Sequence, residues 1–95
     1  MKKYLLQIDL SAEQEGVVSF SFATSEIIAA QARLAALRGM RYYVYDISSL
    51  GVVEPICCVT DFESGVFNII GRRMDGAVEF KHSIANGDPD LKEAV

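Results

Sequence analysis

One segment of this chain, residues 24–39, has the spacing of a helix, whereas the segments around it alternate with a period of two. It starts with two residues that can cap a helix, Thr24 and Ser25, and ends at Gly39, a common terminator. Glu26 complements the positive end of the helix dipole. One face, at helical spacing, is lined by Ile27, Ala30, Leu34 and Leu37. A single helix among strands indicates a sheet with one helix packed on it.

A second side of this helix carries only small residues, Ala29, Ala32 and Ala36. Small side chains allow another backbone to come close. We expect this side to pack closely on the sheet. The alternative is a helix–helix contact in a dimer.

Six segments have strand patterns, with apolar residues at alternate positions. They are residues 3–10, 17–23, 41–47, 52–60, 66–73 and 77–83. Because the connections are short, neighbouring strands should run antiparallel. The sequence therefore predicts an α+β fold: one curved antiparallel sheet of five to six strands with one main helix on one face. The predicted order is two strands, the helix and then three or four strands, with a short C-terminal helix as an option in residues 85–95.

Two local signals refine this prediction. Asp75-Gly76 lies between two strand patterns and favours a hairpin with a type I′ turn. Pro55 has no N–H to donate to a neighbouring strand, so we expect it at a sheet edge or a bulge. In residues 17–23, Ser19 and Ser21 should face water or a second layer.

The composition leaves more apolar surface than one helix can cover. The chain has 95 residues, enough for a single domain spanning residues 1–95, and 51% of them are hydrophobic. One helix covers only part of a sheet of five or six strands. The rest of the apolar surface must meet the C-terminal tail, a second subunit or a ligand.

The charge balance narrows the classes of partner. The net charge of −4 disfavours general binding to nucleic acid. No apolar run is long enough to cross a bilayer, and Gln7 and Asp9 interrupt the first apolar stretch too early for a signal peptide. We therefore expect a cytoplasmic protein whose cysteines are reduced.

The two cysteines, Cys57 and Cys58, are adjacent in a predicted strand, where successive side chains point to opposite faces. They should therefore neither bind one metal ion nor form a disulfide with each other. We expect small buried residues and no metal site or cofactor. The alternative is that Cys58 is a reactive thiol.

No motif assigns a catalytic residue. His82 is the single histidine, and no serine or cysteine motif lies near it in the sequence. We expect an exposed histidine at a strand end. An enzyme that uses Cys58 or His82 remains the less favoured hypothesis.

Tyrosines and arginines form two clusters in the sequence, and both residue types are enriched at protein interfaces. The candidate ligand or interface residues are Arg41, Tyr42, Tyr43, Tyr45, Arg72 and Arg73, together with Cys58 and His82. One alternative places Tyr43 and Tyr45 in the core and Tyr42 outside. Another is an anion or nucleic-acid site that also uses Arg38.

These observations favour a small non-enzymatic module that binds another protein or associates with itself, most simply as a homodimer. The alternative is a sensor or carrier domain with a small-molecule pocket between helix and sheet. Its lining would come from Phe20, Phe22, Tyr43, Tyr45 and Phe67.

Overall fold

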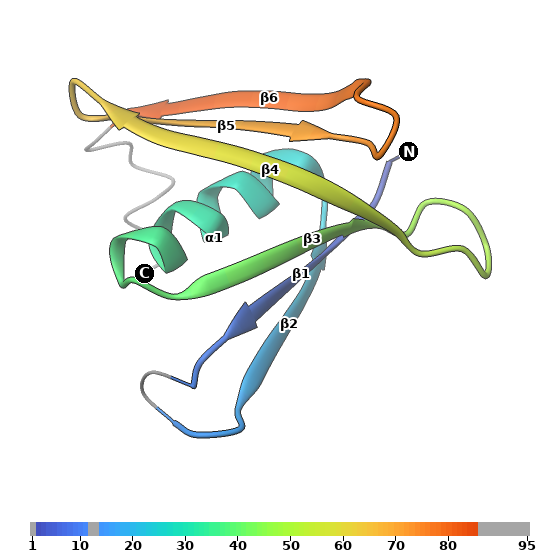
Figure 1. Cartoon of the computed structure of the whole chain (residues 1–95), viewed down its shortest axis with the longest axis horizontal. Coiled ribbons are helices and arrows are strands. Elements are labelled where there is room, and N and C mark those ends of the chain that lie inside the picture. Colours follow the sequence, from blue (N-terminus) through green and yellow to red (C-terminus); the bar gives the residue numbers. More distant parts are fainter. Residues whose placement is uncertain (1, 12–13, 86–95) are drawn as a thin grey trace.

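The computed structural model describes residues 2–11 and 14–85, which form one antiparallel sheet and one helix (Figure 1). The elements are β1 (Tyr4–Asp9), β2 (Val18–Ala23), α1 (Ser25–Leu37), β3 (Arg41–Asp46), β4 (Glu54–Glu63), β5 (Val66–Arg72) and β6 (Val78–Ala85). The six strands lie in the order β2-β1-β3-β4-β5-β6. This is the α+β fold that the sequence predicts. The suggested C-terminal helix lies outside the described residues.

α1 connects the edge strand β2 to β3, which lies on the other side of β1. β1 and β2 form a hairpin, α1 follows, and β3 returns to pair with β1 on the side away from β2. The later strands then follow one another in sequence order. β2 and β6 are therefore the two edges of the sheet. Among the described residues, no helix is long and apolar enough to cross a membrane.

The sheet curves around α1, which lies between its two halves (Figure 1). The bend lies in the long strand β4. Its first residues pair with β3, and from Cys57 onward it pairs with β5. α1 contacts β1, β2 and β3 on one side and β6 on the other. The concave side of the sheet is therefore filled by the helix.

Pro55 lies in the first part of β4, opposite Tyr45 of β3. Pairing with β5 begins only at Cys57. β4 is an inner strand of the sheet, but it has a neighbour on only one side at Pro55. The missing N–H therefore removes no bond to β5, in agreement with the expectation of a local edge.

The buried side of α1 is the alanine side. Ala29 and Ala32 are fully buried, whereas Ile27 and Leu37 are 51% and 56% exposed. Close packing of the alanine side on the sheet is therefore confirmed, and Ile27 and Leu37 lie outside the core. A helix inside a curved sheet must approach two walls, and small side chains permit this approach.

The core between α1 and the sheet is closely packed. Its fully buried large side chains are Tyr4, Leu6, Ile28, Phe67 and Ile69. Gly71 makes room for the Phe80 ring, because a Cβ atom at Gly71 would lie 2.5 Å from that ring. Glycine is therefore required at this position by packing.

The alternation of side chains in β2 and β3 is as predicted, but the buried side differs. Ser19 and Ser21 face α1 and are half-buried, whereas Phe20 and Phe22 are 57% and 63% exposed. Both phenylalanines therefore lie outside the core. In β3 the half-buried Tyr42 packs against the core. Tyr43 and Tyr45 point to the opposite side, so the alternative that places these two in the core is wrong.

Both later hairpins exist, but the type I′ turn lies between β4 and β5, not at the predicted place between β5 and β6. Ser64 and Gly65 have φ of 52° and 78°, as a type I′ turn requires. At Asp75-Gly76 only Gly76 has positive φ, and the Arg73 N–H donates to the Ala77 carbonyl at 2.8 Å. This is a wider loop closed by a left-handed glycine, so the predicted type I′ turn at this place is wrong.

Candidate functional site

The side of the sheet that faces away from α1, here called the open face, carries a band of aromatic and aliphatic side chains. It crosses four strands through successive cross-strand pairs. One row runs from Phe22 through Leu5 and Tyr45 to Pro55. The next row contains Phe20, Gln7 and Tyr43.

These side chains are held on regular strands and are open to solvent. Phe20, Phe22 and Tyr43 are 57%, 63% and 45% exposed. Val59 of β4 extends the band and is 58% exposed. Tyr43 and Tyr45 also line a shallow hollow of about 280 Å³ with Pro55 and Cys57. Monomeric proteins seldom expose so many large apolar residues on one continuous surface.

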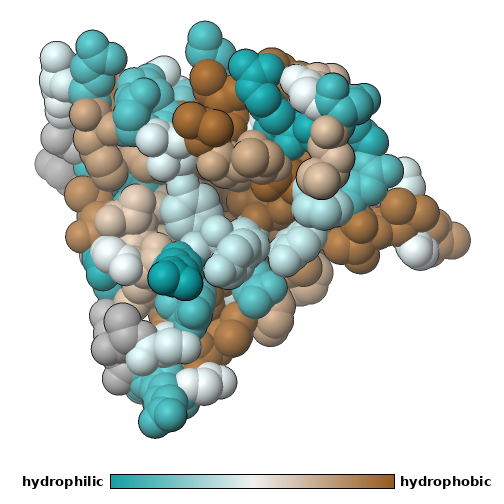
Figure 2. All heavy atoms as spheres, viewed as in Figure 1, coloured by the Kyte–Doolittle hydropathy of each residue, from teal (hydrophilic) through white to brown (hydrophobic). Residues whose placement is uncertain are grey.

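The connection between β3 and β4 adds a second apolar feature. Figure 2 shows hydrophobic atoms at the projecting tip on the right, where Figure 1 places this connection. Leu50 is fully exposed, and Val52 and Val53 are 45% and 61% exposed. Val53 precedes Pro55 by two positions, so the end of this loop lies next to the last residue of the first row of the open face.

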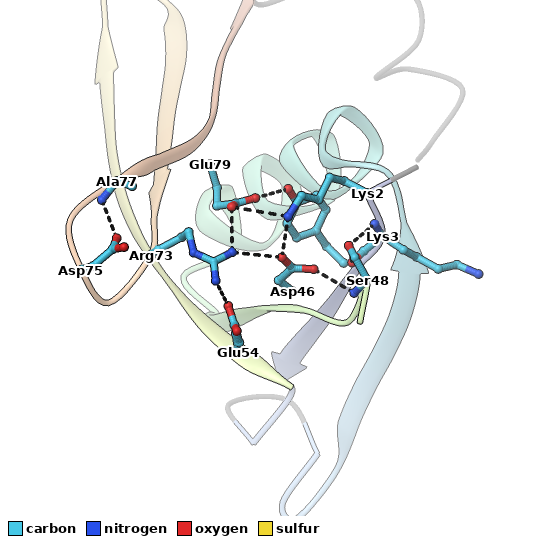
Figure 3. A network of polar contacts seen from close by, with 10 residues as sticks. Lys2, Lys3, Asp46, Ser48, Glu54, Arg73, Asp75, Ala77 and Glu79 are labelled. Carbon is cyan, nitrogen blue, oxygen red and sulfur yellow. Dashed lines mark hydrogen bonds and ion pairs between the residues drawn. The ribbon is translucent and has the colours of Figure 1, made fainter. Parts of the chain in front are cut away.

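A charged cluster ties one end of the sheet together on the side of α1 (Figure 3). Arg73 Nη1 lies 3.0 Å from Glu79 Oε1 and 3.5 Å from Asp46 Oδ2, and its other terminal nitrogen bonds Glu54. Lys2 Nζ lies 3.1 Å from the same Asp46 oxygen. The side chains of Asp46 and Glu79 are only 7% and 9% exposed.

Hydrogen bonds keep these two buried carboxyl groups ionised. Burial raises the pKa of Asp46, but bonds from Ser48 and the Lys2 ammonium outweigh it and hold the pKa below its usual value. The Tyr4 phenol and the Arg73 guanidinium lower the pKa of Glu79. Arg73, a predicted site residue, is therefore engaged by three carboxylates. The cluster joins β1, β3, β4 and β6 and acts as a structural clamp.

The other two predicted arginines lie on the open face, apart from Arg73. Arg41 lies opposite Asp9 in the β1–β3 pairing. Arg72 lies opposite Cys57 and donates a 3.1 Å hydrogen bond to the Gly76 carbonyl. Both are exposed. The three arginines therefore do not form one basic patch.

The two thiols lie on opposite sides of β4. Cys57 is exposed on the open face, whereas Cys58 is half-buried and packs against the core. Burial, with a smaller effect of Cys57, raises the pKa of Cys58 to about 12. Because the thiolate is the nucleophile, Cys58 is a poor candidate for catalysis at neutral pH.

His82 has a partner that its sequence neighbourhood does not show. Its Nε2 lies 2.9 Å from Oγ of Ser25, the first residue of α1, and its ring stacks on Phe80. His82 is half-buried, not an exposed strand-end residue. Among residues 2–11 and 14–85, no carboxylate bonds its other ring nitrogen. This pair fastens the start of α1 to β6.

The predicted lining of a helix–sheet pocket is dispersed. Phe67 is fully buried in the core, and the other four residues lie on the open face. A different hollow of about 320 Å³ does exist beside α1. It is lined by Ile8, Leu10, Ser19, Ser21, Gln31, Leu34, Ala35, Arg38 and Met40. Gln31 Oε1 is buried, with no hydrogen-bond partner among the described residues.

Comparison with known proteins identifies no relative: no family model, no curated protein and no solved structure matches this chain.

Proposed function

We propose that this protein is a small non-enzymatic module that acts by association through its open face, with itself or with another protein. The observation that carries the proposal is the pair of exposed phenylalanines beside exposed Tyr43 on regular strands. Aromatic residues supply much of the binding energy at protein interfaces. Burying one phenylalanine stabilises a complex by about 1.5–3 kcal/mol before the costs of association.

Other features agree with a binding role. The buried carboxylates are held by cations and hydrogen bonds, and the Cys58 thiol is protonated at neutral pH. The net charge of −4 favours a protein partner over nucleic acid. A cytoplasmic location also fits, because Cys57 and Cys58 diverge and cannot pair with each other.

The test is the oligomeric state at micromolar concentration, measured by sedimentation equilibrium. We expect a concentration-dependent dimer. In the Phe20→Ser/Phe22→Ser double variant, the dissociation constant should rise at least about tenfold, since loss of buried aromatic area exceeds 1.4 kcal/mol. Met74→Ser is the matched control, because Met74 is 79% exposed in the β5–β6 turn, away from the open face. A strict monomer that captures no protein would contradict the proposal.

A second candidate is small-molecule binding in the hollow beside α1. The buried and unpartnered Gln31 Oε1 favours it, because such an acceptor requires a donor from water or a ligand. A ligand with an N–H or O–H group on an apolar body should raise Tm of the wild type. It should not raise Tm of Leu34→Trp, which fills the hollow. Equal shifts in both proteins would remove this candidate.

A further inference from the structure

The two edges of the sheet differ in the features that prevent pairing with another chain. β6 carries Glu79 and Lys81, and charged residues are a common protection of exposed edges. β2 has the sequence VSFSFA, without charge or proline. Its exposed side chains are phenylalanines and a valine. β2 is therefore an unprotected edge.

The direction of the free backbone groups of β2 follows from two hydrogen bonds. The Leu10 N–H donates to the Val17 carbonyl at 3.0 Å, so residues 17, 19, 21 and 23 direct their backbone groups toward β1. The Ile47 N–H donates to the Lys3 carbonyl, so the odd-numbered residues of β1 direct their backbone groups toward β3. The even-numbered residues of β1 then direct theirs toward β2, which agrees with the first bond. Val18, Phe20 and Phe22 therefore direct their N–H and C=O groups outward from the sheet edge.

The same three residues present large apolar side chains on the open face. A second β-strand along this edge would gain main-chain hydrogen bonds and aromatic contacts together. The edge is also complementary to itself. In an antiparallel pair centred on Phe20, Val18 lies opposite Phe22 of the partner subunit, and all three outward-facing residues are paired. On the side of the sheet that faces α1, Ser19 lies opposite Ser21 of the partner subunit, so no like charges meet.

We propose that two copies of this chain pair through antiparallel β2 strands, with Phe20 opposite Phe20 of the partner subunit. The two sheets become one continuous sheet, and the two open faces form one aromatic surface. A two-fold axis at Phe20 gives an interface that uses the same residues on both subunits. This inference rests on the proposed self-association and specifies its geometry.

Amide hydrogen exchange of the wild type tests the geometry directly. The Ser19 and Ser21 N–H groups bond β1 and should exchange slowly at every protein concentration. The Phe20 and Phe22 N–H groups should slow as concentration rises, by about tenfold when nine-tenths of the chains are paired. A dimer in which Phe20 and Phe22 still exchange rapidly would overturn the edge pairing and leave association through the open face intact. A monomer at all concentrations would overturn self-association and with it the edge pairing, and slowing only on addition of a different protein would replace the second copy by that partner.

Disulfide trapping tests the register in a Cys57→Ser background, which removes the exposed native thiol. Directly opposed Cα atoms in a hydrogen-bonded pair are about 5.5 Å apart, within disulfide range. Phe20→Cys should therefore cross-link with itself under mild oxidation. Val18→Cys is the matched control, because two Val18 positions are about 13 Å apart in this register. It should cross-link only when mixed with Phe22→Cys. Equal cross-linking of Phe20→Cys and Val18→Cys alone would overturn the register.

Discussion

The Tyr4 phenol donates a 2.7 Å hydrogen bond to Glu79 Oε2, joining β1 to β6, the first and last of the described strands, across 75 positions of sequence. Tyr4 is 2% exposed, and its ring also meets Phe80 edge-on at 5.4 Å. β1 and β6 are not neighbours in the sheet. The contact therefore joins the two halves of the curved sheet to each other through side chains.

We expect Tyr4→Phe to destabilise the protein by about 1–2 kcal/mol, because the buried Glu79 carboxylate loses a hydrogen bond. The ring and its packing remain, so the loss reports the hydroxyl alone. Urea unfolding followed by circular dichroism measures it. Lys81→Gln, an exposed change on the same strand, should stay within about 0.5 kcal/mol. Equal stability of Tyr4→Phe and the wild type would mean that the bond contributes nothing.

Stability should fall in acid. The folded-state pKa values of Asp46 and Glu79 lie below their ordinary values of 3.8 and 4.5. Depressed carboxyl pKa values add stability that is fully present above the ordinary values and is lost as pH falls through the folded ones. The urea midpoint should therefore be flat near neutrality and drop below about pH 4.5. Glu79→Gln should reduce this drop, and an unchanged pH profile would show that the clamp is not its source.

Gly71→Ala should destabilise the fold by about 1–3 kcal/mol, as expected for overpacking. The added Cβ would lie 2.5 Å from the Phe80 ring and 2.9 Å from Ile56 Cγ2. Thermal unfolding of the variant measures the loss. In a Phe80→Leu background the added methyl group has more room, so the same change should be less harmful there. The same loss in both backgrounds would show that the ring is not the obstacle.

The two sides of α1 should differ in how strongly a change of side-chain size affects stability. Ala32→Leu adds bulk to a fully buried position and should destabilise by about 1–3 kcal/mol. Leu37→Ala removes bulk from a side chain that is 56% exposed and should change stability by no more than about 0.5 kcal/mol. Chemical denaturation compares them. The reverse order would place the larger residues on the packed side.

The two thiols should differ in reactivity with a soluble aromatic disulfide at pH 8. Cys57 is exposed and should react within the native state. Cys58 is half-buried, its pKa is raised to about 12, and it should react only on unfolding. Cys57→Ser should remove the fast phase, and Cys58→Ser should keep it. Two fast thiols in the native protein would contradict this placement of Cys58.

Local patterns in the sequence determined which residues share a side of each element. The alternation in β2 and the alanine spacing in α1 are visible without a structure, as are five to six strands whose neighbours run antiparallel. Short connections make neighbouring strands antiparallel whatever the core contains. The sequence also indicates Tyr43 and Tyr45 as candidate interface residues, because tyrosine is enriched at interfaces.

For the strands, only the tertiary structure decided which side is buried. Ser19 rather than Phe20 faces the helix, and Tyr42 rather than Tyr43 packs against the core. A periodic pattern is the same whichever side faces inward. Curvature of the sheet requires the helix to come close, and close approach selects small residues over large ones. Phe20 and Phe22 are left on the open face, and distant pairs such as Ser25 and His82 come together only in the folded chain.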